Sequence, residues 1–81
     1  MNFSILVCDD STVARKQVIR CLQQCIDADI QQATNGAQAI ELLKTNRFDL
    51  LCLDLTMPEI DGVGVLEYIK TNKIECFVLV I

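Results

Sequence analysis

The sequence predicts a single α/β domain built on a doubly wound parallel sheet. Short apolar runs, each too short for a helix, alternate along the 81 residues with longer segments whose apolar residues recur at helical spacing. The runs are apolar at consecutive positions, which is typical of parallel strands that helices cover on both faces. Because crossovers between parallel strands are right-handed, the order β-α-β-α-β-α-β favours the doubly wound arrangement.

The first strand and the first helix are expected in residues 3–26. The run FSILVC at 3–8 predicts a buried strand that stops at two aspartates, which are poor strand formers. Ser11 or Asp10 can cap the helix that follows, and helical spacing continues to about Ile26. Its apolar residues are expected to face the sheet: Ala14, Val18, Cys21, Leu22 and Cys25. Its polar residues are expected to face solvent: Arg15, Lys16, Gln23 and Gln24.

The second strand and the second helix are expected in residues 30–46. The run IQQAT at 30–34 is the least apolar of the four predicted strands. Thr34, Asn35 and Gly36 then combine the signals of a turn and a helix cap. The apolar stripe of the helix, which ends near Asn46, consists of Ala37, Ala39, Ile40 and Leu43.

The remaining elements are a third strand at 49–55, a third helix and a fourth strand at 76–81. The third strand (DLLCLDL) is apolar except for Asp54 near its C-terminal end and the aspartate that opens it. In the segment TMPEIDG that follows, Pro58 and Gly62 exclude regular structure. The third helix is predicted by apolar residues three positions apart: Val63, Leu66 and Ile69.

The charge and hydropathy patterns exclude several classes of function. The net charge is −4 and no cluster of Lys or Arg is present, which argues against direct contact with nucleic acid. No run approaches the roughly 18 apolar residues of a membrane span, and the N-terminus lacks the pattern of a secretion signal. A cytoplasmic protein without membrane contact is therefore expected.

The five cysteines favour buried free thiols over disulfides. Their number is odd, and three of them stand in strand-like apolar runs: Cys8, Cys52 and Cys76. Cys21 and Cys25 are four residues apart on one helix, which is poor geometry for a disulfide. Because the chain has no histidine and no C-x-x-C pair, a zinc site is disfavoured.

Three carboxylates are expected at one edge of the sheet. Asp9 and Asp10 directly follow the first strand and Asp54 ends the third, and ligands bind beyond the carboxyl ends of strands in open α/β sheets. Such a cluster repels itself, and its oxygen ligands suit Mg²⁺. A carboxylate beside a metal can also act as a nucleophile toward phosphorus. The alternative for Asp9 and Asp10 is that they cap the helix and interact with its dipole.

Three segments closely resemble the receiver domain of two-component response regulators, including chemotaxis regulators. They are VCDDS at 7–11, TNGAQAIELL at 34–43 and FDLLCLDLTMPEIDGVGVLEYI at 48–69. The resemblance implies the flavodoxin-like receiver fold, whose complete sheet has the order 2-1-3-4-5. The four strands and three helices of residues 1–81 would form the N-terminal two-thirds of that domain.

The resemblance also implies the roles of the site residues. Asp54 is similar to the acceptor that forms 4-aspartylphosphate in a phosphorelay, taking the phosphoryl group from the phosphohistidine of a sensor kinase or a phosphotransfer protein. Asp10 would bind Mg²⁺ directly, Asp9 largely through water, and Thr56 through its backbone carbonyl. The loop at the phosphoryl group would contain Thr56, Met57, Pro58 and Gly62. No cofactor besides Mg²⁺ is implied, and an output domain would lie outside this chain.

The chain departs from the family pattern at its C-terminal end. A family member continues through a Ser or Thr, a fourth helix, a fifth strand that ends in a Lys, and a fifth helix. We therefore expect either a fragment, truncated after the fourth strand, or an oligomer that completes the sheet between chains.

Two rival functions remain open. One is a pseudo-receiver that acts only as a protein-binding module. The other is an aspartate-nucleophile phosphohydrolase, but Asp54-Leu55-Thr56 lacks the second acid of the D-x-D pattern in such enzymes. The expected protein is not an enzyme with turnover; it assists its own phosphorylation and dephosphorylation.

Overall fold

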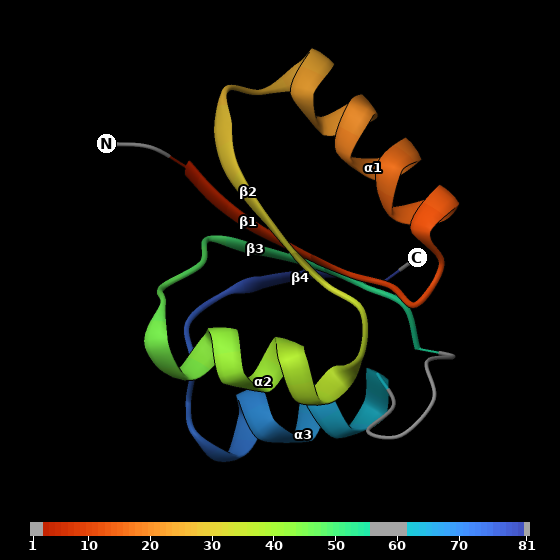
Figure 1. Ribbon diagram of the computed structural model, residues 1–81. Coiled ribbons are helices and arrows are strands. Elements are labelled where there is room, and N and C mark those ends of the chain that lie inside the picture. The colour runs from red at the N-terminus through yellow and green to blue at the C-terminus, as the bar shows by residue number, and fades with distance from the viewer. Residues whose placement is uncertain (1–2, 56–61, 81) are drawn as a thin grey trace.

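Four parallel strands form one sheet in the order β2-β1-β3-β4 (Figure 1). The computed structural model describes residues 3–55 and 62–80. The strands are β1 (Phe3–Cys8), β2 (Ala28–Ala33), β3 (Leu50–Leu53) and β4 (Phe77–Val80). The predicted fold class is confirmed, because a parallel sheet with this order requires the crossovers of a doubly wound domain.

Helices cover both faces of the sheet. They are α1 (Thr12–Cys25), α2 (Gly36–Thr45) and α3 (Gly62–Thr71). Figure 1 shows α1 on one face, with α2 and α3 side by side on the other. None of the helices in residues 3–55 and 62–80 is long and apolar enough to cross a lipid bilayer.

Strand boundaries follow the pairing register more closely than the apolar runs. β2 begins at Ala28, before the predicted Ile30, because Ala28 pairs with Phe3 at the start of β1. β3 ends at Leu53, which pairs with Cys8 at the end of β1. Asp54 lies just beyond this pair, and its N–H still donates to the carbonyl of Cys8 at 3.0 Å.

The two helix starts for which the sequence predicts a cap, those of α1 and α2, are capped by side chains. The Ser11 Oγ accepts a hydrogen bond from the N–H of Ala14 at 3.2 Å, so Ser11 rather than Asp10 caps α1. The Asn35 Oδ1 accepts from the N–H of Gln38 at 2.8 Å and caps α2. Each cap satisfies a backbone donor that the helix leaves unpaired.

The core has two layers, one on each side of the sheet. The layer under α2 and α3 contains Leu6, Cys8, Ala33, Ala39, Leu43, Phe48, Leu51, Leu53 and Val65. The layer under α1 is smaller, with Ile5, Val7 and Cys52 at its centre. Fully burying one such Leu, Ile or Val side chain contributes about 1.5–3 kcal/mol, so β1 and β3 anchor the domain.

The predicted inner face of α1 was right for Val18 and Leu22, which pack against the core, but wrong for three other residues. Arg15 was expected to face solvent, but it is buried, with 8% of its surface exposed. Cys21 and Cys25 were expected to face the sheet, but both are exposed. The helix packs through a stripe at spacings of three and four residues: Arg15, Val18, Ile19 and Leu22. Lys16, Gln23 and Gln24 are exposed as predicted.

The cysteines form no disulfide bonds, but only some are buried. All five are thiols rather than half-cystines, as predicted. Cys8 and Cys52 are buried on β1 and β3, Cys76 is half-buried, and the two on α1 are exposed. The expectation of buried thiols therefore holds only for the residues in the central strands.

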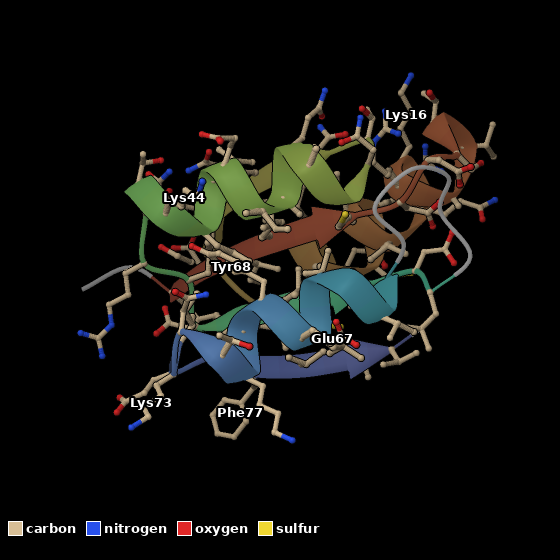
Figure 2. All side chains as sticks on the ribbon, turned by 90° about the horizontal axis from the view of Figure 1, so that it is seen from below. Lys16, Lys44, Glu67, Tyr68, Lys73 and Phe77 are labelled. Atoms are coloured by element: carbon tan, nitrogen blue, oxygen red, sulfur yellow. The ribbon has the colours of Figure 1, made fainter. Side chains whose placement is uncertain are left out.

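The fourth strand is less covered than its apolar sequence predicts. Phe77 is 79% exposed, Leu79 50% and Val80 49%. Figure 2 shows the Phe77 ring at the margin of the molecule, beside β4. The reason is positional: β4 pairs with β3 on one side, and α1 packs over β1 and β2 instead of β4.

Candidate functional site

Asp9, Asp10 and Asp54 meet at the C-terminal edge of the sheet. One carboxylate oxygen from each lies within 4.8 Å of the others. Asp9 is buried, Asp10 is exposed and Asp54 is half-buried, so the cluster reaches from the interior to solvent. The juxtaposition follows from the sheet order, because β1 and β3 are neighbours and the aspartates directly follow them.

The main chain of the site is held by extensions of the strand ladder. The Asp9 N–H donates to the carbonyl of Ala33, at the end of β2, at 3.1 Å. The Asp54 N–H donates to Cys8, at the end of β1. Because neighbouring strands hydrogen-bond to these peptides, the main-chain positions from which the Asp9 and Asp54 side chains project are fixed.

The pKa of Asp9 is shifted by its surroundings. Burial raises its pKa, the backbone N–H of Ser11 lowers it by donating to Oδ1 at 2.9 Å, and the negative charges of Asp54 and Asp10 raise it further. The net direction is upward. Burial and repulsion thus disfavour the charged form of Asp9, and a bound cation would offset both effects by stabilising the carboxylate.

The Cys8 thiol borders this cluster but is a poor ligand. Burial raises its pKa to about 12, and the charges of Asp9 and Asp54 contribute while Arg15 opposes them. The thiol is therefore protonated near neutral pH, and metals bind the thiolate. The donors that remain are carboxylate oxygens, which fit a hard divalent cation such as Mg²⁺ better than Zn²⁺.

Arg15 belongs to the surroundings of the site, although the sequence analysis placed it in solvent. Its Nη1 donates to the main-chain carbonyl of Asp9 at 2.9 Å. Its Nε donates to Gln32 Oε1 at 3.1 Å, and its Nη2 to Thr12 Oγ1 at 3.4 Å. The signal for this position was present: Arg15 continues the apolar stripe of α1 at spacings of three and four residues.

Gly62 packs directly against the main chain that follows β3. A Cβ at this position would lie 2.5 Å from Leu55 Cα and 2.7 Å from the carbonyl oxygen of Asp54. No side chain fits at that distance, so the start of α3 can approach the acidic edge only with glycine here. The other predicted loop residues, Thr56, Met57 and Pro58, lie outside the described residues.

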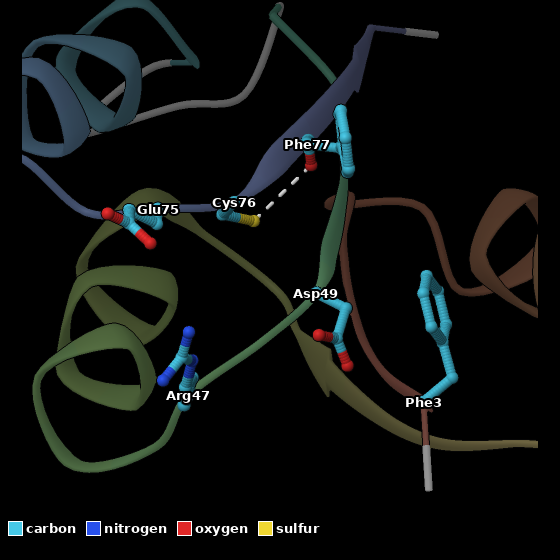
Figure 3. A pocket seen from close by; sticks show the side chains of 6 residues that line it. All are labelled: Phe3, Arg47, Asp49, Glu75, Cys76 and Phe77. Carbon is cyan, nitrogen blue, oxygen red and sulfur yellow. Dashed lines mark hydrogen bonds between the residues drawn. The ribbon is translucent and has the colours of Figure 1, made fainter.

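A pocket lies at the N-terminal ends of the strands, opposite the acidic cluster. It has a volume of about 360 Å³ and is lined by Phe3, Arg47, Asp49, Glu75, Cys76 and Phe77 (Figure 3). Asp49 is engaged there, because its Oδ2 accepts from the N–H of Ser4 at 2.8 Å. None of the three clustered aspartates lines this pocket.

Comparison with known proteins identifies the family. The sequence profile of the response regulator receiver domain matches residues 5–81. The chain belongs to this family. Among its relatives, the receiver is 39% identical over 70 residues to the chemotaxis protein CheY of Bacillus subtilis. That alignment covers 86% of this chain and 58% of CheY, so the receiver spans little more than half the length of this relative.

Solved receiver structures share the arrangement of strands and helices. The response regulator TrrA from Thermotoga maritima, in complex with Mg²⁺ and BeF, has a TM-score of 0.89 and 31% identity, covering 96% of this chain and 67% of TrrA. The CheX–CheY–BeF₃–Mg²⁺ complex of Borrelia burgdorferi matches with a TM-score of 0.88 and 29% identity, covering 96% of this chain and 60% of that one. These neighbours carry the metal and the fluoride group in their own structures.

Proposed function

We propose that this receiver takes up a phosphoryl group on Asp54 from the phosphohistidine of a sensor histidine kinase or a phosphotransfer protein. The observation that carries the proposal is the meeting of the Asp9, Asp10 and Asp54 carboxylates within 4.8 Å at the end of β1 and β3. One half-buried carboxylate beside two others is the arrangement that a nucleophile with a metal site needs.

In this reaction Asp54 is the nucleophile, and all three acids (Asp9, Asp10 and Asp54) would be ligands of the metal. A carboxylate oxygen of Asp54 attacks the phosphorus, the P–N bond of the phosphohistidine breaks, and its electron pair returns to the imidazole nitrogen. Asp10 is exposed and would bind Mg²⁺ directly, whereas the buried Asp9 would hold the ion largely through water. Bound Mg²⁺ would neutralise charge on the transferring phosphoryl oxygens.

The loop after β3 completes this proposal. Thr56 would supply a backbone carbonyl to the metal, and its side chain would influence the lifetime of the aspartyl phosphate. Gly62 allows α3 to begin against the Asp54 carbonyl, so this helix starts beside the acceptor residue. Met57 and Pro58 would shape the loop without taking part in chemistry.

The relatives support the same assignment and a wider context. The neighbouring TrrA and CheY structures hold Mg²⁺ with a beryllium fluoride, and one of them is a complex with CheX. We propose that residues 1–81 correspond to the N-terminal two-thirds of a receiver, with any output domain outside them. The five cysteines, none of which is in a disulfide, fit a reducing, cytoplasmic location.

Phosphorylation of the purified chain tests the proposal. The chain is incubated with Mg²⁺ and acetyl phosphate, and intact mass is measured before and after treatment with alkali. We expect a gain of one alkali-labile phosphate that is lost in Asp54→Asn and without Mg²⁺. Asp27→Asn is the matched control, because Asp27 is an exposed aspartate outside the cluster and should leave labelling unchanged.

Other outcomes would favour the rival functions. A chain extended to the length of its relatives is tested in parallel. Absence of label on both chains would favour a pseudo-receiver that only binds proteins. Repeated turnover of phosphate esters would favour a phosphohydrolase.

A further inference from the structure

Arg15 and Asp9 are the two buried charged side chains among the described residues. They lie six residues apart in sequence and meet at the start of α1, where Arg15 Nη1 reaches the Asp9 carbonyl. Burying a guanidinium is costly unless its donors are satisfied. The use of a buried charge at this place therefore calls for an explanation beyond packing.

The guanidinium donates hydrogen bonds to three acceptors from three parts of the fold. They are the Asp9 carbonyl after β1, the Gln32 side chain on β2 and the Thr12 hydroxyl in the first turn of α1. The planar guanidinium has several N–H donors in fixed directions and can therefore bind three such segments at once. A lysine ammonium places its donors on one nitrogen and cannot span them in the same way. Arg15 is thus a clamp between β2, α1 and the connection that carries Asp9 and Asp10.

The clamp completes the restraint of the Asp9 residue. Its N–H is bound by Ala33, its carboxylate Oδ1 accepts from the N–H of Ser11, and its carbonyl accepts from Arg15. The Asp9 carbonyl belongs to the peptide that leads into Asp10. Holding this carbonyl therefore holds the direction in which the Asp10 side chain leaves the main chain.

We propose that Arg15 is a positioning residue for the divalent cation: it fixes the Asp9–Asp10 peptide so that both carboxylates address the same ion as Asp54. This inference rests on the proposed function of the acidic cluster. Partners that orient metal ligands in this way typically change metal affinity by about 10- to 100-fold when they are replaced.

Two substitutions separate positioning from simple charge. Arg15→Lys keeps the positive charge but loses the planar guanidinium, and Arg15→Met removes both. If Arg15 positions the ligands, both variants should bind Mg²⁺ about 10-fold or more weakly by calorimetry. If Arg15 acted mainly as a cation that repels Mg²⁺, Arg15→Met would bind it more tightly and Arg15→Lys would bind it equally well.

Two further substitutions provide the control and a gentler perturbation. Lys16→Met removes the same charge from the neighbouring exposed residue, which projects outward from α1 (Figure 2), and should leave Mg²⁺ affinity unchanged. Gln32→Met removes one acceptor of the clamp from an exposed position on β2. We expect it to weaken Mg²⁺ binding by a few-fold, and it keeps the test available if Arg15→Met does not fold.

A second readout is independent of the metal. In the metal-free chain, the Asp9 carbonyl-carbon and Asp10 amide-nitrogen chemical shifts should change in Arg15→Lys and stay constant in Lys16→Met. Unchanged Mg²⁺ affinity in folded Arg15→Lys and Gln32→Met would overturn the inference about Arg15. The proposed function would still hold in that case if Asp54 of the wild type is phosphorylated. A wild-type chain that neither binds Mg²⁺ nor takes up phosphate would overturn both.

Discussion

At the scale of single residues, the acidic cluster combines fixed geometry with unfavourable electrostatics. Asp9 is buried and its pKa is raised, while Asp10 and Asp54 bring further negative charge within 4.8 Å. A site that is strained without a cation gains the most when one binds, because the ion removes repulsion as well as adding bonds. Binding and stability should therefore be linked at this edge of the sheet.

The raised pKa of Asp9 predicts an inverted pH dependence. Because the folded state holds this proton more tightly than the unfolded state, Asp9 favours folding at low pH. Its contribution falls as pH rises from the ordinary value near 3.8 through the raised pKa. The measurement is the free energy of unfolding in urea without divalent ions, from pH 3.5 to 7.5, for the wild type and Asp9→Asn.

The difference between the two proteins isolates the effect. Asn keeps an oxygen for the Ser11 N–H, so the wild type should lose stability relative to Asp9→Asn as pH rises. Saturating Mg²⁺ should remove this loss. A wild type that gains stability over Asp9→Asn with rising pH would contradict the prediction.

At the scale of elements, the starts of the helices place the functional side chains. α1 begins at the Ser11 cap beside Asp9 and Asp10, and α3 begins at Gly62 against the main chain of Asp54 and Leu55. These helix starts thus form part of the walls of the site. Their local sequence therefore affects both stability and the position of the acceptor.

Gly62→Ala should destabilise the domain and disturb the acceptor. The added Cβ would meet backbone atoms at 2.5 and 2.7 Å, which only a shift of α3 or of the Asp54 segment can relieve. Overpacking of this kind costs about 1–3 kcal/mol. The cost is measured by chemical unfolding, and phosphorylation of Asp54 by acetyl phosphate should slow as well.

Val63→Ala is the matched control for that substitution. Val63 follows Gly62 on α3 but is 49% exposed, so its truncation should change stability by less than about 0.5 kcal/mol. Equal stability of Gly62→Ala and Val63→Ala would show that the close approach of α3 is not required.

The α2 cap offers a test away from the site. Asn35→Ala removes the acceptor for the Gln38 N–H, 2.8 Å away, and should cost about 1 kcal/mol of stability. Asn35→Asp retains the acceptor and should remain close to the wild type in thermal unfolding. Phosphate uptake should not change in Asn35→Asp, since α2 contributes no residue to the acidic cluster.

At the scale of the whole molecule, the two edges of the sheet differ. The β2 edge carries exposed polar side chains such as Asp29 and Gln31. The β4 edge has no charge within Phe77–Val80, and three of its four side chains are about half exposed or more. Uncharged, exposed edge strands are ready templates for pairing with another chain.

We predict that the 81-residue chain self-associates through β4 as its concentration rises. Phe77→Lys should shift this association to higher concentration, because a charge on the edge strand must be desolvated when strands pair. The measurement is sedimentation velocity over a range of concentrations. Val13→Lys is the control, since Val13 is 67% exposed on α1, which does not pack on β4. Equal effects of both substitutions would indicate association without involvement of β4.

Local sequence patterns were sufficient to predict the order of strands and helices, a helix cap at Ser11 or Asp10, a cap signal at 34–36, and the meeting of Asp9, Asp10 and Asp54. Each of these depends on local signals: apolar runs, cap residues, and the rule that parallel strands end at a common edge. The sequence did not determine which side of α1 faces inward. The prediction placed Cys21 and Cys25 in the core, which rotated the predicted inner face of α1 about the helix axis and assigned Arg15 to solvent.

Three features follow from packing in the folded chain and were not predicted from the sequence: the burial of Arg15, the exposure of β4 and the contact of Gly62 with the Asp54 segment. Arg15 turns inward because acceptors from β2, the Asp9 carbonyl and Thr12 converge on it, and these residues are distant or unremarkable in sequence. β4 is exposed because burial depends on which elements pack over a strand, whatever its own hydrophobicity. Local preferences specify the elements, but the burial of each side chain depends on neighbours that only the assembled fold provides.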